Sequence, residues 1–312
     1  MSGYSVNASN GMLTPIAGSP FTAGHRPSAV AVDSAGAYAF VSNYGDDTLS
    51  VYGIDLTTGV LNPIGAPVAT GSSPAAVTVS PNGRFVYVAN WGGDSVSAYS
   101  LNRTTGALTP VGTVGAGAGT NAIVVDPAGA FAYAVNQDNG TVSIYSIDGS
   151  SGALTAAGTA ATGGFPYAMT IAANGTLAFV VNSGSNNVSA YAINSATGAL
   201  TAVGTYATGT APLSITLNAA GTLAYVANSG SNAVSEYGVG TTGVLTPLGS
   251  PVSTGSNPYN VTLNPGGTLA YVANYGSANV SAYNVDPASG ALTLVGNYSA
   301  GTEPVSVVVA QP

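Results

Sequence analysis

Residues 87–90 read Tyr-Val-Ala-Asn, and close variants of this stretch recur along the whole chain. The copies follow one another at steps of 46 or 47 residues, and several other positions keep the same step. A period of about 40 to 50 residues with four strand signals is typical of a β-propeller, in which each repeat forms one blade. The asparagines that end the copies are Asn43, Asn90, Asn136, Asn182, Asn228 and Asn274, and the tyrosines of the next strand are Tyr52, Tyr99, Tyr145, Tyr191, Tyr237 and Tyr283.

The second repeat shows how one unit divides into strands. Short β-branched or aromatic runs alternate with Gly, Asn, Pro and Ser, which is the pattern of strands and turns. We expect strand A over 75–80, strand B over 84–90, strand C over 95–101 and strand D over 108–114. The predicted fold is therefore all-β, a single seven-bladed β-propeller domain over residues 1–312 with about 46 residues per repeat.

Six full repeats run from about 24 to 300, and the two ends match parts of a seventh. Residues 4–16 resemble the end of strand C with strand D, and residues 303–311 resemble strand A. Residues 1–23 and 301–312 are thus expected to form an incomplete closing blade that lacks strand B and the start of strand C, about 13 residues. Two explanations stay open. The sequence starts inside a repeat of a longer protein, or another chain donates the strand, because an open sheet edge is a pairing template.

The composition excludes many kinds of chemistry. Only 4% of the residues are charged, with three arginines, no lysine, one histidine, no cysteine and a net charge of −8. Nucleic acid is not expected as a partner, because phosphate binding needs a basic face. Cysteine-based metal sites, thiol nucleophiles and lysine chemistry are excluded as well, and we predict no metal site and no cofactor. No apolar run approaches the roughly 20 residues of a membrane span.

The repeated Tyr-Val-Ala-Asn with its glycine-rich turns resembles the YVTN-type β-propellers. The Gly-x-Leu-Thr turns and the closing stretch Gly301–Val309 resemble the lactonase family, which includes 6-phosphogluconolactonase. This resemblance implies that the C-terminal segment supplies the innermost strand of the last blade. It also implies hydrolysis of a lactone by His, Arg and acidic residues around the channel mouth, and only His25 and Arg26 match that set.

His25, Arg26 and Glu303 are the candidate catalytic residues under that reading. Arg26 and Glu303 occupy the same repeat position, each before a proline, in the first and seventh units. These units are neighbours once the ring closes. The favoured interpretation is a salt bridge or hydrogen bond across the closure, and the alternative is a general acid–base cluster with His25.

Aromatic residues are the candidate binding residues. The D–A and B–C loops of a propeller share one face, and variation there between otherwise uniform repeats is where function can be encoded. Such aromatic faces suit stacking on a sugar or contact with a protein, although packing between blades explains them equally well. Tyr44, Trp91 and Tyr275 follow the repeat asparagine in three units, and Tyr259 and Tyr167 come from D–A loops.

Acidic residues cluster in the B–C turns of the first three repeats. Asp46, Asp47, Asp94 and Asp138 could offer oxygens to calcium, but no calcium-loop spacing is present. Asp also stabilises turns by hydrogen bonding to backbone, and that interpretation is favoured.

These observations lead to a prediction of a non-enzymatic protein that is secreted or displayed at the cell surface. It would be a binding or self-assembling scaffold, with a protein or glycan bound on the loop face and a homo-oligomer or filament formed through the open closing blade. The lack of a full catalytic set and the weakly charged surface motivate this prediction. The alternative function is a lactonase-type hydrolase that uses His25, Arg26 and Glu303.

Overall fold

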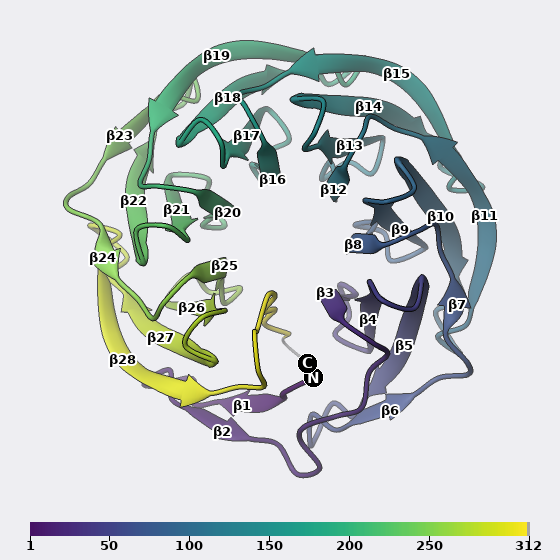
Figure 1. The fold of residues 1–312 in the computed structure, drawn as a ribbon, viewed down its shortest axis with the longest axis horizontal. Coiled ribbons are helices and arrows are strands. Elements are labelled where there is room, and N and C mark those ends of the chain that lie inside the picture. The colour runs from purple at the N-terminus through teal and green to yellow at the C-terminus, as the bar shows by residue number, and fades with distance from the viewer. Residues whose placement is uncertain (311–312) are drawn as a thin grey trace.

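The computed structural model describes residues 1–310, which form antiparallel sheets arranged in a ring (Figure 1). The chain is an all-β propeller, and residues 1–310 contain no helix. Accordingly, no helix in this range is long and apolar enough to cross a membrane. The first strand of each sheet lies nearest the centre of the ring and the last lies outermost (Figure 1).

Six sheets, named blades 1 to 6 here, follow one another in chain order. Blade 1 contains β3 (Pro27–Val32), β4 (Tyr38–Asn43), β5 (Thr48–Ile54), β6 (Leu61–Pro63) and β7 (Val68–Ala69). Blade 2 contains β8 (Pro74–Val79), β9 (Phe85–Asn90), β10 (Ser95–Leu101) and β11 (Leu108–Gly115). Blade 3 contains β12 (Thr120–Val125), β13 (Phe131–Asn136), β14 (Thr141–Ile147) and β15 (Leu154–Ala161).

The remaining blades repeat this order. Blade 4 contains β16 (Pro166–Ile171), β17 (Leu177–Asn182), β18 (Asn187–Ile193) and β19 (Leu200–Ala207). Blade 5 contains β20 (Pro212–Leu217), β21 (Leu223–Asn228), β22 (Ala233–Val239), β23 (Leu245–Pro247) and β24 (Val252–Ser253). Blade 6 contains β25 (Pro258–Leu263), β26 (Leu269–Asn274), β27 (Asn279–Val285) and β28 (Leu292–Ser299), and a two-stranded hairpin pairs β1 (Tyr4–Val6) with β2 (Leu13–Pro15).

The strands predicted for the second repeat are confirmed to within one residue at every end. Turn residues explain why the strands stop there. Gly83, for example, has a φ of 65° and donates its N–H to the carbonyl of Ser80, a backbone conformation that favours glycine. Asn82 accepts the N–H of Arg84 in the same turn.

The repeat asparagines hold the loops of each blade together. Asn136 donates its amide to Thr141 Oγ1 at 3.0 Å and to Ser143 Oγ at 2.9 Å, and its Oδ1 accepts the N–H of Gly117 at 3.1 Å. All six asparagines of this column are fully buried. A buried polar group needs such partners, so the column has a structural role in fixing the two loops that it joins.

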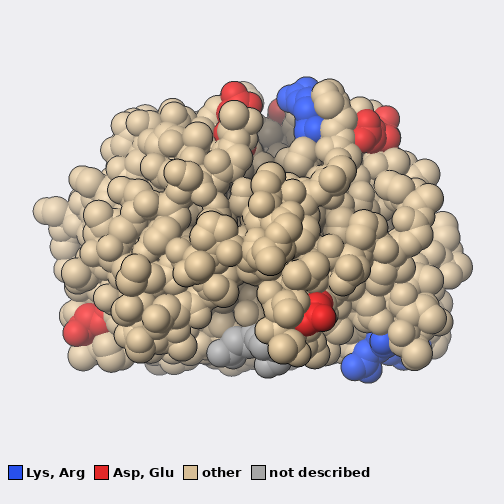
Figure 2. Space-filling view, turned by 90° about the horizontal axis from the view of Figure 1, so that it is seen from below, with Lys and Arg blue, Asp and Glu red and all other residues tan. Residues whose placement is uncertain are grey.

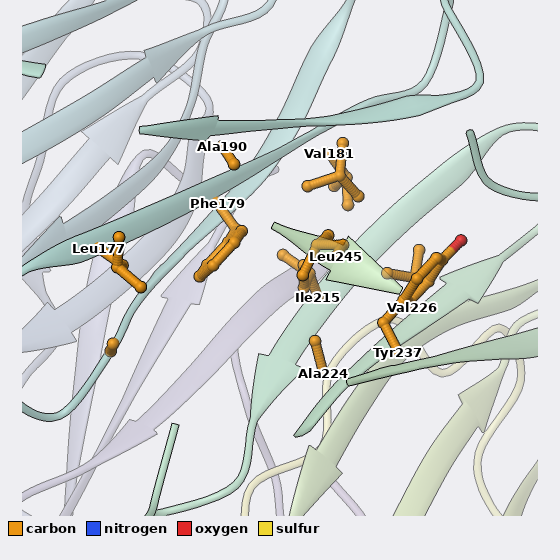
Figure 3. Packing of buried hydrophobic residues seen from close by; sticks show 11 residues of the cluster. Leu177, Phe179, Val181, Ala190, Ile215, Ala224, Val226, Tyr237 and Leu245 are labelled. Atoms are coloured by element: carbon orange, nitrogen blue, oxygen red, sulfur yellow. The ribbon is translucent and has the colours of Figure 1, made fainter. Parts of the chain in front are cut away.

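Apolar packing between neighbouring blades forms the core. Figure 3 shows the cluster between blades 4 and 5, in which Phe179 and Val181 of β17 pack toward Ile215 and Val226 of blade 5. Side chains on both faces of each blade are buried in this way, which explains why the inner and middle strands contain few charged residues.

Tyrosine hydroxyls add a second contact between units. Tyr99, Tyr145 and their equivalents each donate to a carbonyl exactly 30 residues earlier in the chain, for example Tyr145 to Gly115 at 2.7 Å. Tyr4 of β1 makes the same contact with the carbonyl of Ser299 at the other end of the chain. Tyr271 of blade 6 likewise donates to the carbonyl of Gly11, which repeats the bond from Tyr225 to Gly290.

The C-terminal segment runs inward from β28 and lies between β25 and β3 (Figure 1). Val307 N–H donates to Asn260 Oδ1 at 3.1 Å on the blade 6 side, and Val30 N–H donates to Ser306 Oγ at 3.4 Å on the blade 1 side. The prediction of strand A over 303–311 is only partly met. Residues 303–310 follow the inner-strand path without a strand ladder, because no strand lies in register beside them, and Gln311 lies outside the described residues.

Candidate functional site

The loops that enter the inner strands hold one residue each in a left-handed backbone conformation. The seven positions share a φ between 50° and 68° and form one ring on the face that carries the D–A and B–C loops. The main chain then joins both loop types, since the N–H of Tyr44 donates to the carbonyl of Arg26 and that of Trp91 to the carbonyl of Ser73. The seven residues of this rim are Arg26, Ser73, Gly119, Phe165, Ala211, Asn257 and Glu303.

Aspartates of the B–C turns serve this backbone geometry. Asp46 accepts the N–H of His25 at 2.6 Å, and Asp47 accepts the N–H of Ser73 in the next unit at 2.6 Å. Asp94 accepts the N–H of Gly119 at 2.8 Å. Within residues 1–310 no three His, Cys, Asp or Glu side chains come together as a metal site. These contacts support the turn-stabilising interpretation of the acidic residues.

Arg26, Tyr44 and Trp91 lie together on one side of the rim. The guanidinium carbon of Arg26 is 5.0 Å from the centre of the Tyr44 ring, a cation–π arrangement. The Tyr44 and Trp91 rings are 6.4 Å apart and tilted by 37°. Figure 2 shows a basic group flanked by acidic groups on the upper edge of the molecule, whereas most of the visible surface is uncharged.

Tyr275, Tyr259 and Tyr167 form a second aromatic group. The ring centres of Tyr275 and Tyr259 are 5.8 Å apart, and those of Tyr259 and Tyr167 are 5.7 Å apart at nearly a right angle. The hydroxyls of Tyr259 and Tyr167 are hydrogen bonded to each other. The five aromatic residues predicted for binding thus form two contiguous groups. The placement of Tyr167 and Tyr259 in D–A loops was wrong, because they belong to the inner strands β16 and β25.

Glu303 and Arg26 meet at Tyr275. The carboxylate of Glu303 is the main cause that raises the pKa of Tyr275, with smaller contributions from burial and from Tyr259. Arg26 acts in the opposite direction. Among residues 1–310 no salt bridge or hydrogen bond joins Arg26 to Glu303, so the predicted direct contact across the ring closure is not formed. Tyr275 lies near both residues instead, a position that the sequence pattern did not indicate.

His25 lies at the outer part of the same loop. Its Nδ1 is so close to the backbone of Gly45 that a Cβ at Gly45 would come within 2.3 Å of it. The side chain is exposed, and its main-chain carbonyl accepts the N–H of Gly45. Of the three candidate catalytic residues, Arg26 and Glu303 are therefore gathered around Tyr275, and His25 packs against the turn.

Phe165 is a rim residue that the sequence analysis did not select. Its side chain is 56% exposed, and its ring lies against Gly184 of the neighbouring turn. The signal was present in the repeat, since Phe165 is the one aromatic residue at the left-handed position, where Gly or Asn is easiest to accommodate.

An all-β ring of repeated antiparallel sheets defines the class as a β-propeller, and the comparisons identify the family. The family model for "Lactonase, 7-bladed beta-propeller" matches residues 3–120, 112–217 and 208–309. The chain belongs to this lactonase family. No curated protein sequence matches it significantly.

Solved structures agree on the fold. A candidate 6-phosphogluconolactonase of Bacteroides fragilis is similar with a TM-score of 0.88 and 21% identity, covering 98% of this chain and 92% of that one. The periplasmic gluconolactonase PpgL of Pseudomonas aeruginosa has a TM-score of 0.85 and 22% identity, covering 99% and 94%. A candidate 6-phosphogluconolactonase of Bacteroides uniformis has a TM-score of 0.87 and 21% identity, and the match covers 97% of this chain and 93% of that one.

These findings correct the prediction of a non-enzymatic scaffold. That prediction relied on the scarcity of charged residues, yet the family match covers nearly the whole chain and favours the hydrolase alternative. The reasoning failed because a scarcity of charge over the whole chain does not show how the few charged residues are distributed. Location outside the cell, a protein or glycan partner and self-association stay predictions.

Proposed function

We propose that this protein hydrolyses a lactone at the mouth of the propeller channel. Membership of the lactonase family over residues 3–309 supports the reaction class. The observation that carries the proposal is the proximity of Glu303, Tyr275 and Arg26 at the ring closure, where the carboxylate raises and the guanidinium lowers the pKa of the Tyr275 hydroxyl.

The reaction needs a base for water and a cation for the carbonyl oxygen. Glu303 takes a proton from water, whose oxygen attacks the lactone carbonyl carbon. Arg26 stabilises the negative charge that develops on the carbonyl oxygen. The carbonyl then re-forms as the ring C–O bond breaks, and the released alkoxide takes the proton back from Glu303, which leaves a hydroxy acid.

Tyr275 orients the base in this scheme. Its hydroxyl is protonated at neutral pH, as that of a tyrosine ordinarily is, and in this scheme it donates to one oxygen of the Glu303 carboxylate. The other oxygen of Glu303 then accepts the proton from water.

The charges of the loop face favour an uncharged substrate. Two basic side chains, His25 and Arg26, stand on this face beside the acidic turns. A phosphorylated lactone would meet more negative than positive charge at close range. We therefore propose an unphosphorylated sugar lactone, whose apolar ring face can stack on the rim aromatics. The acidic residues concerned are Asp46, Asp47, Asp94, Asp138 and Glu303.

We also propose that the hairpin β1–β2 and residues 304–309 together act as the seventh blade. In the hairpin, Tyr4 and Gly11 make the same tyrosine-to-carbonyl hydrogen bonds as the equivalent residues of complete repeats. In the C-terminal segment, Ser306 occupies the inner-strand position of Ser214 and Asn260, and the side chain at this position accepts an N–H from the next unit. The description of the family as seven-bladed supports this count.

A lactonase assay tests the proposed reaction. D-Glucono-1,5-lactone and its 6-phosphate are offered to the protein, acid release is followed with a pH indicator, and spontaneous hydrolysis is subtracted. We expect turnover of the unphosphorylated lactone, and we expect Glu303→Gln to lower kcat by about 10²-fold or more. Arg26→Ala is expected to lower kcat/KM by a similar factor, about 10²-fold.

Arg103→Ala is the matched control, because Arg103 is an exposed arginine in a C–D turn away from the loop face. It removes the same charge and should leave kcat and KM unchanged. Wild-type kinetics in Glu303→Gln would show that the base lies elsewhere.

A further inference from the structure

Every inner strand of blades 1 to 6 contains a β-bulge at its second residue. In β16 the pairing register passes from Pro166 to Ala168 and leaves out Tyr167, and in β25 it passes from Pro258 to Asn260 and leaves out Tyr259. A bulge turns its extra residue out of the ladder and re-aims that side chain. The bulge residues of blades 1 to 6 are Ser28, Ala75, Asn121, Tyr167, Leu213 and Tyr259.

We call these six residues the bulge column, and its two tyrosines show the direction in which its side chains extend. Tyr167 belongs to blade 4 and Tyr259 to blade 6, so β20 of blade 5 lies between their strands. Their hydroxyls nevertheless meet, so both side chains extend past β20 toward each other. Burial there raises the pKa of Tyr167, as expected for a hydroxyl held away from water.

The column is filled unevenly around the ring. Tyr167, Leu213 and Tyr259 place large side chains on the side of blades 4 to 6. Blades 1 and 2 carry Ser28 and Ala75 instead. Ser28 also turns along the wall, where its hydroxyl donates to the carbonyl of Pro74 at 2.6 Å.

Asn121 behaves in the same way in blade 3. Its amide donates to the carbonyl of Tyr167 at 2.8 Å, so it reaches along the wall to the next strand and not across the channel. On the side of blades 1 to 3 the column therefore holds smaller side chains than on the side of blades 4 to 6. The inner strands of blades 1 and 2 pair with β4 and β9, and Tyr44 and Trp91 directly follow these two strands.

We infer that the bulge column determines which lactones fit, and that the substrate ring lies against Ser28 and Ala75, below Tyr44 and Trp91 and beside the Tyr167–Tyr259 bridge. This inference rests on the proposed function for the identity of the ligand. The site accepts a single uncharged sugar ring, because the tyrosine bridge closes the other half of the channel. Its specificity is steric: one repeat position sets the size of the ligand.

Substitution of Ala75 tests the inference without a change of fold. Ala75→Tyr places at blade 2 the residue that blades 4 and 6 already carry at the same bulge, so the backbone can accommodate it. Leu213→Tyr is the matched control, because it adds the same side chain on the side that is already filled. We expect Ala75→Tyr to raise KM for D-glucono-1,5-lactone about 10- to 100-fold, the cost of losing well-packed contacts in a pocket, and Leu213→Tyr to change it less than about twofold.

A second measurement separates this inference from the proposed function. Trp91 is the only tryptophan, so its fluorescence reports ligand at the rim, and D-gluconolactam is a ring of the same shape that is not hydrolysed as a lactone. We expect the lactam to change the fluorescence of the wild type and of Leu213→Tyr, and to have a Kd at least tenfold higher for Ala75→Tyr.

The outcomes are distinct. Turnover by the wild type with an equal KM in Ala75→Tyr would overturn the inference and leave the proposed function standing. Lactam binding that Ala75→Tyr weakens, with no turnover by the wild type, would support the position of the ring and reject the hydrolase. Equal losses in both tyrosine variants would overturn the inference, and neither binding nor turnover by the wild type would overturn both.

Discussion

The junction between blades 4 and 5 and the sector where the ring closes are held together by different forces. Between blades 4 and 5, eleven buried residues form one apolar cluster around Phe179 and Ile215 (Figure 3). At the closure, the cluster on blade 1 contains only Ala39, Val41 and Tyr52 as buried members, and that on blade 6 contains five. At the closure, hydrogen bonds made by residues of both chain ends join the neighbouring blades.

This difference places the candidate site in the sector with the least apolar burial. Arg26 and Glu303 lie on opposite sides of the closure and Tyr275 lies beside it. Sectors with few buried apolar contacts open at lower free energy than the rest of a fold, and binding sites are commonly found there. The comparison therefore predicts that mutations between blades 4 and 5 mainly lower stability, whereas mutations at the closure mainly lower activity.

The largest effect on stability is expected from a truncated side chain in the apolar junction between blades 4 and 5. Phe179→Ala removes a fully buried ring between blades 4 and 5 and should lower the free energy of unfolding by about 3–5 kcal/mol. Val307→Ala at the closure removes a partly buried side chain and should cost about 1 kcal/mol. Guanidinium unfolding followed by circular dichroism measures both, and equal losses would contradict the proposed difference in packing.

Glu236 offers a pH-dependent test of the same contrast. It lies on β22, is 8% exposed, and accepts the N–H of Leu292 in blade 6 at 2.9 Å. Burial raises its pKa, so its contribution to stability is fully present below the unfolded pKa of about 4.3 and is lost as the pH rises through the folded value. Glu236→Gln should therefore raise Tm at pH 8 by a few degrees and leave it nearly unchanged at pH 4.

Glu303→Gln is the control for that experiment. Glu303 is an exposed carboxylate at the closure, and its replacement should affect activity without a comparable pH-dependent gain in Tm. A Tm difference for Glu236→Gln that does not grow between pH 4 and pH 8 would show that the carboxylate stays well solvated.

The smallest effects are expected from the tyrosine column. Tyr237→Phe removes a hydrogen bond of 2.7 Å from a buried ring to the carbonyl of Ala207 and should cost about 1 kcal/mol. Tyr4→Phe removes the equivalent bond at the closure, which is exposed, and should cost less than half of that. A larger loss for Tyr4 would mean that this one bond dominates the closure.

Much of the fold could be predicted because its determinants lie within one repeat. The asparagine and tyrosine columns recur at a fixed step, and most of their contacts repeat with them, as Asn136 and Tyr145 show. The inner-strand path of residues 303–310 was predictable too, since Ser306 matches Ser214 and Asn260. Its missing ladder was not, because a ladder depends on what lies beside the segment.

The site was harder to predict because it depends on the radius of the ring. Tyr167 and Tyr259 are 92 residues apart and belong to blades that are not neighbours in the ring, so no local pattern indicates that their hydroxyls meet. The role of Tyr275 beside Glu303 likewise arises only when the last inner segment reaches the first blade. The pattern could not tell how the aromatic residues divide into two groups, and their role in binding stays a prediction.

The acidic turns have a consequence for turnover under the proposed reaction. A neutral lactone enters past Asp46, Asp47 and Asp94 without electrostatic cost, whereas its hydrolysis product is an anion. The same side chains that brace the loops therefore repel the product and speed its escape, so accumulated hydroxy acid would compete poorly with fresh substrate. Added salt would screen this repulsion and make product inhibition stronger.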